Sequence, residues 1–242
     1  VNGVAVLTLK PYFYPQRELV LDAQDFDIHV FSLITKGKES ELNFRYDGQT
    51  VTAYLPQTYT AKDTIQVRIK YTAKPNENPE LGSAAITDTK GLYFINPRGE
   101  DPNKPTLIWT QGETGFNREW AVTWDYPNDF TTTETITTVP AKWEVVGNGI
   151  PVSNTVKNGR RTAHWKMSQP HATYLLSLVA GQVAIKKDVW NGTPLWYVVP
   201  ASQKETIDPS FSDTHDMLTF FSNITGVTVP AGWSCTTSGR AG

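Results

Sequence analysis

Asp63-Thr-Ile-Gln-Val-Arg-Ile-Lys-Tyr71 is the stretch of this sequence in which the pattern of side chains is clearest. Its apolar residues fall at every second position from 65 to 71, and Gln66, Arg68 and Lys70 stand between them. Because successive side chains of a strand point to opposite faces, this alternation puts one face on a core and the other in water. The segment is therefore predicted to be a half-buried strand of an antiparallel sheet.

Short segments of the same kind recur along the chain and are separated by residues that favour turns. They lie at residues 4–9, 28–33, 41–46, 50–55, 91–95, 133–139, 142–146, 162–167, 173–179 and 195–199. The turns include Asp47-Gly48, Asn148-Gly149, Asn158-Gly159 and Asn191-Gly192, pairs that readily adopt positive φ angles. No long helices alternate with the strands, so the pattern predicts antiparallel sheets packed face to face, an all-β sandwich.

One helix is expected near the end of the chain, over residues 211–224. Its apolar residues share one helical stripe: Met217, Leu218, Phe221 and Ile224. Gly226 follows as a residue that can end the helix. The prediction is thus an all-β fold with one short C-terminal helix.

Charge and composition exclude several classes of partner. The chain has 22 Lys and Arg against 24 Asp and Glu, without a basic stripe, so the footprint of a nucleic-acid-binding protein is missing. No apolar run approaches the ~20 residues that cross a bilayer, and no leader-like segment precedes Val1. We therefore expect neither nucleic acid nor a membrane as a partner. A single cysteine, Cys235, allows no internal disulfide, and the compartment stays open.

The residues show no catalytic centre of their own. None of the four histidines is followed by the Glu and second His of a helical zinc-binding His-Glu-x-x-His sequence, and the nearest segment, His215-Asp-Met-Leu-Thr219, lacks both. No Gly-x-Ser-x-Gly elbow occurs either. The histidines are therefore interpreted as structural or surface residues, and we expect no catalytic residue and no metal ligand in this chain.

Residues 109–120, Trp-Thr-Gln-Gly-Glu-Thr-Gly-Phe-Asn-Arg-Glu-Trp, are the most informative segment. They combine aromatic residues, glycines and acids and are too polar for a buried strand, which predicts a shaped loop. On this loop the Glu113 carboxylate, near the Gln111 amide, could hold a cationic amine, because ionised acceptors make the stronger hydrogen bonds. Taken alone, the segment favours the simpler interpretation of a solvated loop carboxylate.

Thr110-Gln-Gly-Glu113 resembles the Thr-Gln-x-Glu signature of the aminopeptidase N family, gluzincin zinc metallopeptidases that include leukotriene hydrolase-like members. Asp125-Tyr-Pro127 lies at the offset of that family's Asp-x-Pro. Further matches follow in the same order: Gly91-Leu-Tyr93, Thr138-Val-Pro140, Asn148-Gly149, His164-Trp165, Tyr174-Leu175, Val179-Ala-Gly181 and Gly226-Val227. Before residue 91 only pieces such as Leu19-Val-Leu-Asp-Ala23 match.

The resemblance implies both a fold and a role. In that family this domain is a saddle-like, antiparallel β-sandwich that covers a zinc-bearing catalytic domain, and the acid of the signature holds the free α-amino group of the substrate. Glu113 matches that acid, and Gln111 would help to shape the pocket for the first side chain. Residues 1–227 would then be a non-catalytic N-terminal domain. Its partners would be a peptide N-terminus and the catalytic domain of the same polypeptide, where zinc is expected.

The sequence departs from the family in three places. Arg118-Glu-Trp-Ala-Val-Thr123 replaces the usual Arg and aromatic-Pro pair after the loop. The Gly-Ala-Met-Glu-Asn and zinc-binding sequences are absent, so the chain alone is expected to hydrolyse nothing. After Val227 the match stops, and shifting the codons of residues 232–238 by one base restores a family-like Trp-Leu-Val-Val-His-Asp-Phe. Residues 228–242 are therefore interpreted as a non-native or disordered tail.

Two other functions stay open at this stage. A free-standing β-sandwich module that binds carbohydrate or protein would use Trp109, Trp120 and Trp124 as exposed platforms. An inactive homologue of the family would account for the altered loop after Glu113. A domain that docks on a catalytic partner predicts instead an exposed apolar patch.

Overall fold

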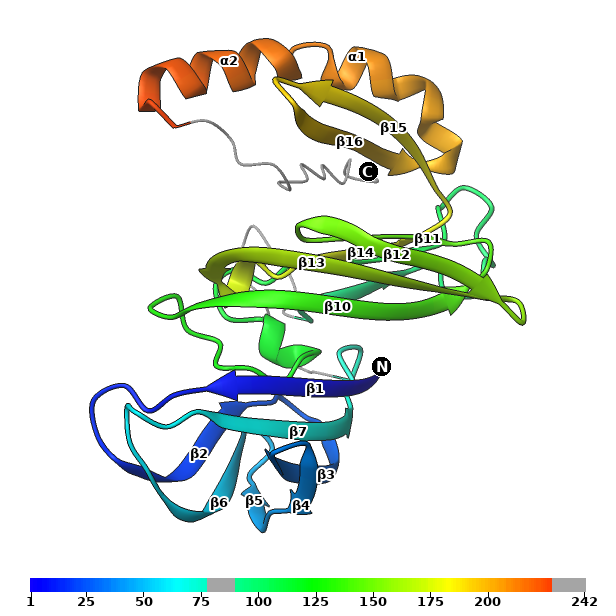
Figure 1. The fold of residues 1–242 in the computed structure, drawn as a ribbon. Coiled ribbons are helices and arrows are strands. Elements are labelled where there is room, and N and C mark those ends of the chain that lie inside the picture. Colours follow the sequence, from blue (N-terminus) through cyan, green and yellow to red (C-terminus); the bar gives the residue numbers. More distant parts are fainter. Residues whose placement is uncertain (78–89, 228–242) are drawn as a thin grey trace. The chain divides into compact units, whose positions relative to one another are not determined.

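A computed structural model of the chain describes residues 1–77 and 90–227 (Figure 1). The strands are β1 (Asn2–Leu9), β2 (Gln16–Asp22), β3 (Asp27–Thr35), β4 (Lys38–Glu41), β5 (Phe44–Tyr46), β6 (Thr50–Tyr59), β7 (Ile65–Thr72), β8 (Leu92–Ile95), β9 (Leu107–Thr110), β10 (Phe130–Pro140), β11 (Glu144–Gly147), β12 (Ile150–Lys157), β13 (Arg160–Ala172), β14 (Leu178–Gly181), β15 (Val183–Trp190) and β16 (Thr193–Pro200). The helices are the 3-10 turns η1 (Asn117–Glu119), η2 (Thr173–Leu175) and η3 (Ala201–Thr206), and α1 (Ile207–Phe211) and α2 (Thr214–Thr225). The predicted all-β fold with antiparallel sheets is confirmed.

The chain divides into two compact units. The first contains Val1–Tyr93, Gln111–Phe130 and Ala172–Leu175. The second contains Phe94–Thr110, Thr131–His171 and Leu176–Gly242, of which the structure describes residues up to 227.

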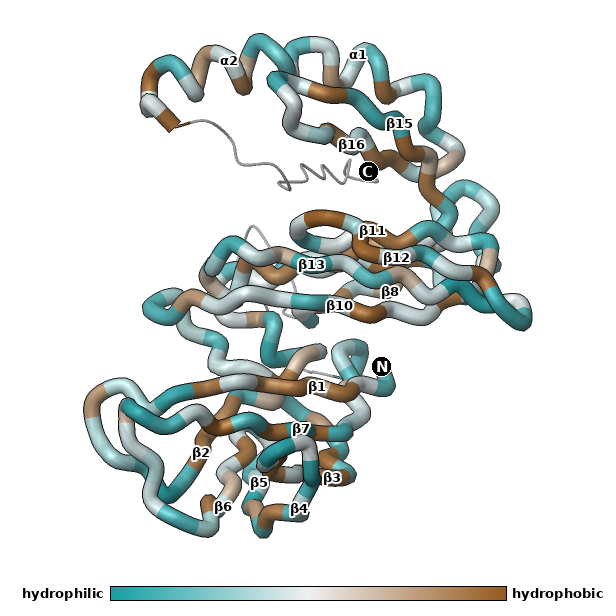
Figure 2. Tube along the Cα trace, in the orientation of Figure 1, coloured by the Kyte–Doolittle hydropathy of each residue, from teal (hydrophilic) through white to brown (hydrophobic). Residues whose placement is uncertain are grey.

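The first unit is built on β7, which is the strand that the alternating segment predicts. β7 pairs antiparallel with β1 and with β3 in a sheet of order β1-β7-β3-β4 (Figure 1). Val67 and Ile69 are fully buried, whereas Lys70 between Ile69 and Tyr71 is exposed. A second sheet, of order β2-β6-β5, shares one apolar core with the first, because Leu21 and Val51 cluster with the buried residues of β7 (Figure 2).

Tyr71 adds a pH dependence to this core. Its hydroxyl donates a hydrogen bond to the Trp120 carbonyl over 3.2 Å, and burial raises the pKa of Tyr71 from 10.0 to about 12. A pKa that is higher in the folded state gives stability that is fully present below the unfolded value and is lost as the pH rises to the folded value. We predict that the free energy of unfolding falls between about pH 10 and about pH 12.

Tyr71→Phe tests this prediction. The variant should lose about 1 kcal/mol at neutral pH, the net value of one hydrogen bond, and should show a smaller decline at alkaline pH. Urea unfolding of both proteins at about pH 8 and about pH 11 measures the difference. An unchanged alkaline decline in Tyr71→Phe would show that Tyr71 is not its source.

The second unit contains two larger sheets, the two-stranded sheet β15-β16 and a helical part. The larger sheets have the orders β10-β13-β12 and β11-β14-β9-β8, and β8 begins in the first unit. The hairpins β12–β13 and β15–β16 turn at Asn158-Gly159 and Asn191-Gly192, where all four φ angles are positive, as type I′ turns require. The predicted turns at these pairs are confirmed.

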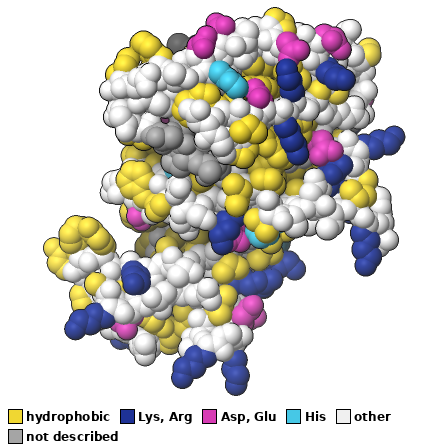
Figure 3. Space-filling model, turned by 45° about the horizontal axis from the view of Figure 1, so that its top comes forward, with side chains coloured by type: hydrophobic (Ala, Val, Ile, Leu, Met, Phe, Trp, Pro, Cys, Tyr) yellow, Lys and Arg dark blue, Asp and Glu magenta, His cyan; other side chains and the backbone are white. Residues whose placement is uncertain are grey.

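Helix α2 confirms the predicted C-terminal helix and corrects what its stripe contacts. It ends at Gly226, which has a φ of 68° and donates its N–H to the Ser222 carbonyl. Leu218 packs against the core formed by the β15–β16 hairpin and α1. Met217, Phe221 and the rest of the predicted stripe are exposed. Figure 3, in which the helices of Figure 1 come forward, shows hydrophobic side chains at the surface there.

Several of the predicted strand boundaries are wrong. The predicted strand 41–46 is two strands, because the Leu42 N–H bonds to Phe31 in one sheet and the Asn43 carbonyl accepts from Tyr54 in the other. The predicted strand 173–179 begins with the 3-10 turn η2. The interpretation of 228–242 as a tail lies outside the described residues. No helix in the described part is long and apolar enough to span a bilayer.

Candidate functional site

The loop that follows β9 carries both residues singled out from the sequence. Gln111 is partly buried, and its backbone N–H donates to the Gly91 carbonyl over 2.8 Å. Glu113 is exposed, and its peptide bond with Thr114 is cis. The predicted loop is confirmed, and its two polar side chains lie two positions apart at its start.

The backbone beneath Glu113 is packed closely. A Cβ at Gly112 would lie 2.5 Å from both the Asn117 Nδ2 and the Tyr174 carbonyl oxygen, so only glycine fits there without a shift. The Phe116 N–H donates to the Gly112 carbonyl over 2.9 Å. These contacts hold the loop immediately before Glu113 in one conformation.

Asn117 joins the loop to Thr173 of η2 and to Trp120 at the end of the same segment. Its Nδ2 donates to the Thr173 carbonyl over 2.6 Å, and its Oδ1 accepts from the Trp120 Nε1 over 2.8 Å. Asn117 and Trp120 are buried. Buried polar groups with satisfied hydrogen bonds favour one arrangement over its alternatives, so the loop that presents Glu113 is fixed after the acid as well as before it.

A buried ion-pair network anchors the end of the loop. The Arg118 guanidinium lies 3.1 Å from the Asp22 carboxylate and donates to the Asp125 carbonyl over 2.9 Å. The Arg118 backbone N–H donates to the Asp125 carboxylate over 3.0 Å, and the Asp125 N–H donates to the Asp22 carboxylate over 2.8 Å. Burial raises the pKa of the Asp125 carboxyl above its ordinary value, and the hydrogen bond and charge of Arg118 oppose this rise.

Sequence reasoning missed this network. It noted Asp22, Arg118 and Asp125 in separate segments and recorded the sequence around Arg118 only as a departure. Two acids in otherwise apolar surroundings, at Leu-Val-Leu-Asp22-Ala and Trp-Asp125, are the signal that could have found it, because buried carboxylates are almost always paired.

The Glu113 carboxylate has no partner of its own. No ion pair or hydrogen bond joins its side chain to another residue of the described part, whereas the nearby Arg118 is engaged by Asp22 and Asp125. An exposed carboxylate on a fixed backbone, without a neutralising cation, can accept hydrogen bonds from an ammonium group.

Metal binding finds no support among residues 1–77 and 90–227, which contain no group of three or more His, Cys, Asp or Glu placed to hold a metal ion. Each histidine instead has a local hydrogen-bond partner: Thr72 for His29, Glu134 for His164, the Gln169 carbonyl for His171 and Asp188 for His215. The interpretation of the histidines as structural or surface residues stays a prediction, and these hydrogen bonds are consistent with it.

The tryptophans do not form the platform that a carbohydrate module would need. Trp120 is buried, so it cannot stack on a ligand, and Trp109 is partly buried. Trp124 is 40% exposed and lies against Tyr126, with ring centroids 4.9 Å apart and planes tilted by 44°. The expectation of three exposed platforms is therefore wrong for Trp120.

These features define an all-β domain that presents an acidic side chain on a fixed loop. Comparison with known proteins gives its family: the chain belongs to the peptidase M1 N-terminal domain family, whose model matches residues 1–175. The resemblance to the aminopeptidase N family is thereby confirmed.

Curated relatives agree with this family. The chain is 27% identical over 145 residues to aminopeptidase N of Acetobacter pasteurianus, and the match covers 58% of this chain and 40% of that protein. It is 25% identical over 147 residues to aminopeptidase RNPEPL1 of Mus musculus, covering 59% of this chain and 18% of that one. The chain thus matches less than half the length of these relatives.

Solved structures show the same fold. The M1 zinc metallopeptidase from Deinococcus radiodurans matches 98% of this chain and 51% of its own, with a TM-score of 0.74 and 20% identity. Legionella pneumophila aminopeptidase A in complex with aspartic acid matches 98% of this chain and 26% of its own, with a TM-score of 0.77 and 16% identity.

Proposed function

We propose that this chain is the part of a zinc aminopeptidase that covers the catalytic domain, and that Glu113 anchors the free α-amino group of the peptide substrate. The carrying observation is the Glu113 carboxylate itself, which is exposed, unpaired within the described residues and presented by a backbone fixed at Gly112 and Asn117. The proposed domain spans residues 1–227, beyond the 1–175 that the family model matches.

The chemistry of the role follows from the geometry. A carboxylate at hydrogen-bond distance from an ammonium selects substrates with a free N-terminus, since an acetylated nitrogen has neither the charge nor the donors. Fixing that end also sets the distance to the scissile bond, which is a contribution of positioning to the rate. Gln111, two positions before Glu113, would help to shape the space for the first side chain.

Residues 1–77 and 90–227 do not fit zinc, because they contain no group of three or more His, Cys, Asp or Glu that could hold a metal ion. The zinc of the proposed enzyme would be held by polypeptide outside this chain. A related structure supports this division between the present chain and a separate zinc-binding part. One mutant of the Deinococcus radiodurans enzyme was solved with a Tyr-Ser-Ala substrate bound, and this chain covers 51% of that protein.

The exposed apolar residues of α2 support a larger polypeptide. Met217, Phe220, Phe221 and Ile224 are each more than half exposed. Contiguous apolar surface of this kind marks an interaction site. The rest of the polypeptide is the proposed cover for this face.

Peptide hydrolysis by the full-length protein and by the 242-residue chain tests the proposal. We expect the full-length protein to release the first residue from a peptide with a free N-terminus and to stop when a chelator removes its metal. The 242-residue chain should release nothing and should keep its circular dichroism spectrum in the chelator. Absence of release by the metal-loaded full-length protein would overturn the proposal in favour of an inactive homologue.

A further inference from the structure

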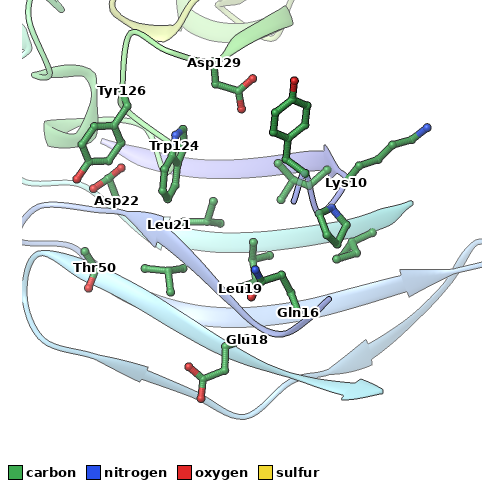
Figure 4. Close-up of a pocket in the computed structure, with 15 residues that line it drawn as sticks. Lys10, Gln16, Glu18, Leu19, Leu21, Asp22, Thr50, Trp124, Tyr126 and Asp129 are labelled. Carbon is green, nitrogen blue, oxygen red and sulfur yellow. The ribbon is translucent and has the colours of Figure 1, made fainter. Parts of the chain in front are cut away.

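A cavity of about 570 Å³ opens on the first unit, away from the loop of Gln111 and Glu113, neither of which lines it (Figure 4). It lies between the end of β1, the start of β2 and the segment from 124 to 129. Leu19, which is partly buried, contributes aliphatic surface to it, and the buried Leu21 and Ile65 also belong to its lining. Burying the apolar part of a ligand on such a floor is favourable.

Three aromatic side chains form its walls. Trp124 and Tyr126 come from one segment and are each about two fifths exposed, and Tyr12 comes from the loop between β1 and β2 and is 82% exposed. The Arg118 guanidinium already lies over the Tyr126 ring, 5.4 Å from its centroid. The faces of aromatic rings attract cations, and that of Trp does so most strongly.

One carboxylate is free to complete the site. Figure 4 shows Asp129 beside Trp124, on the side of the cavity opposite Leu19. The Asp129 carboxylate accepts the Phe130 N–H over 2.8 Å and forms no ion pair within residues 1–77 and 90–227. Asp22, the other acid at this level, is neutralised by Arg118.

The other charged side chains that line the cavity, Glu18 and Lys10, are directed away from Trp124 in Figure 4. The part of the cavity beside Trp124 therefore combines apolar side chains, partly exposed aromatic rings and the carboxylate of Asp129.

We propose that this cavity binds a small organic cation, an ammonium or guanidinium group carried on an apolar stem. The stem lies on Leu19, and the cation lies between the face of Trp124 and the carboxylate of Asp129. A neutral ligand of the same shape gains the apolar contact alone, whereas the cation also gains the ring and the carboxylate. The site is independent of the role proposed for Glu113.

Titration of the 242-residue chain with phenethylammonium chloride, followed by two-dimensional NMR, tests the proposal. We expect saturable shifts of the Trp124 indole N–H and the Leu19 and Leu21 methyl groups. The neutral isostere 2-phenylethanol should bind about tenfold more weakly. Asp129→Asn should reduce the affinity for the cation toward that of the neutral compound, and added salt should weaken the binding.

A matched variant separates this site from general attraction to a negative surface. Glu41→Gln removes an exposed carboxylate of the same unit that does not line the cavity, and it should leave the affinity unchanged. Trp124→Leu keeps an apolar side chain and should reduce the preference for the cation, because the ring is lost while Asp129 remains. Equal binding of both compounds, shifts outside the cavity alone, or an Asp129→Asn variant that binds like the wild type would each overturn the proposal.

Discussion

Glu113→Gln in the full-length protein is expected to lower kcat/KM for a peptide with a free N-terminus by about 25-fold to about 4,000-fold. The substitution keeps the size of the side chain and removes its charge. A desolvated ammonium that loses its carboxylate partner costs about 2–5 kcal/mol, and each 1.4 kcal/mol corresponds to about a factor of ten. Because Glu119, the other acid of the loop, is buried, little compensation is expected.

Two variants control this measurement. Glu113→Asp keeps the charge but withdraws it by one carbon, so its kcat/KM should lie between those of the wild type and Glu113→Gln. Glu205→Gln removes another exposed carboxylate, in η3 of the second unit, and should leave kcat/KM unchanged. A Glu113→Gln enzyme as active as the wild type would exclude the anchoring role.

Arg118→Met is expected to destabilise the chain by about 3–5 kcal/mol. The variant keeps most of the apolar stem and removes the cation, which leaves Asp22 and Asp125, 3% and 2% exposed, without an opposite charge. An unpaired buried charge is far more costly than the loss of an exposed pair. Unfolding in urea, followed by tryptophan fluorescence, measures the change.

The matched control for this prediction is Arg68→Met. Arg68 lies 3.6 Å from Glu39, and both side chains are about a third exposed or more, so its removal should cost less than about 1 kcal/mol. Adding Asp125→Asn to Arg118→Met should restore part of the lost stability, since one of the stranded charges is gone. Equal losses of unfolding free energy in Arg118→Met and Arg68→Met would show that the buried network stabilises the chain no more than an exposed ion pair does.

Alternation and turn chemistry predict much of this fold because both are local. β7 follows from residues 65 to 71, where every second side chain is buried. The hairpin turns follow from Asn158-Gly159 and Asn191-Gly192, whose residues tolerate the positive φ angles that the turns adopt. Such features need no knowledge of what the chain contacts elsewhere.

Elements whose structure depends on contacts with distant parts of the chain could not be predicted in the same way. All eight residues of β12 are exposed, so its sequence carries no alternation between core and water. The break at Leu42 and Asn43 exists because the chain leaves the edge of one sheet for another. In the sequence, the apolar stripe of α2 looks like a core-facing stripe. The pattern alone does not show whether these side chains are buried within the chain, and most of them are exposed.

The candidate site also contains residues that follow from a local motif and residues that meet only in the fold. Gln111 and Glu113 follow from a short motif, and the structure places both at the start of one loop. Asp22 and Asp125 lie 103 positions apart in the sequence and meet only in the fold, so no local pattern pairs them with Arg118. The loop of Glu113 can thus be predicted from the sequence, whereas the ion-pair network of Arg118 that anchors it cannot.

The central claim concerns the amino group, and one comparison tests it most directly. It measures kcat/KM for a peptide and for its N-acetylated form, on the wild-type full-length protein and on Glu113→Gln. We predict that the wild type strongly prefers the free amine and that Glu113→Gln loses most of this preference. A preference that survives undiminished in Glu113→Gln would contradict the claim, because the amino group would then be recognised by another residue.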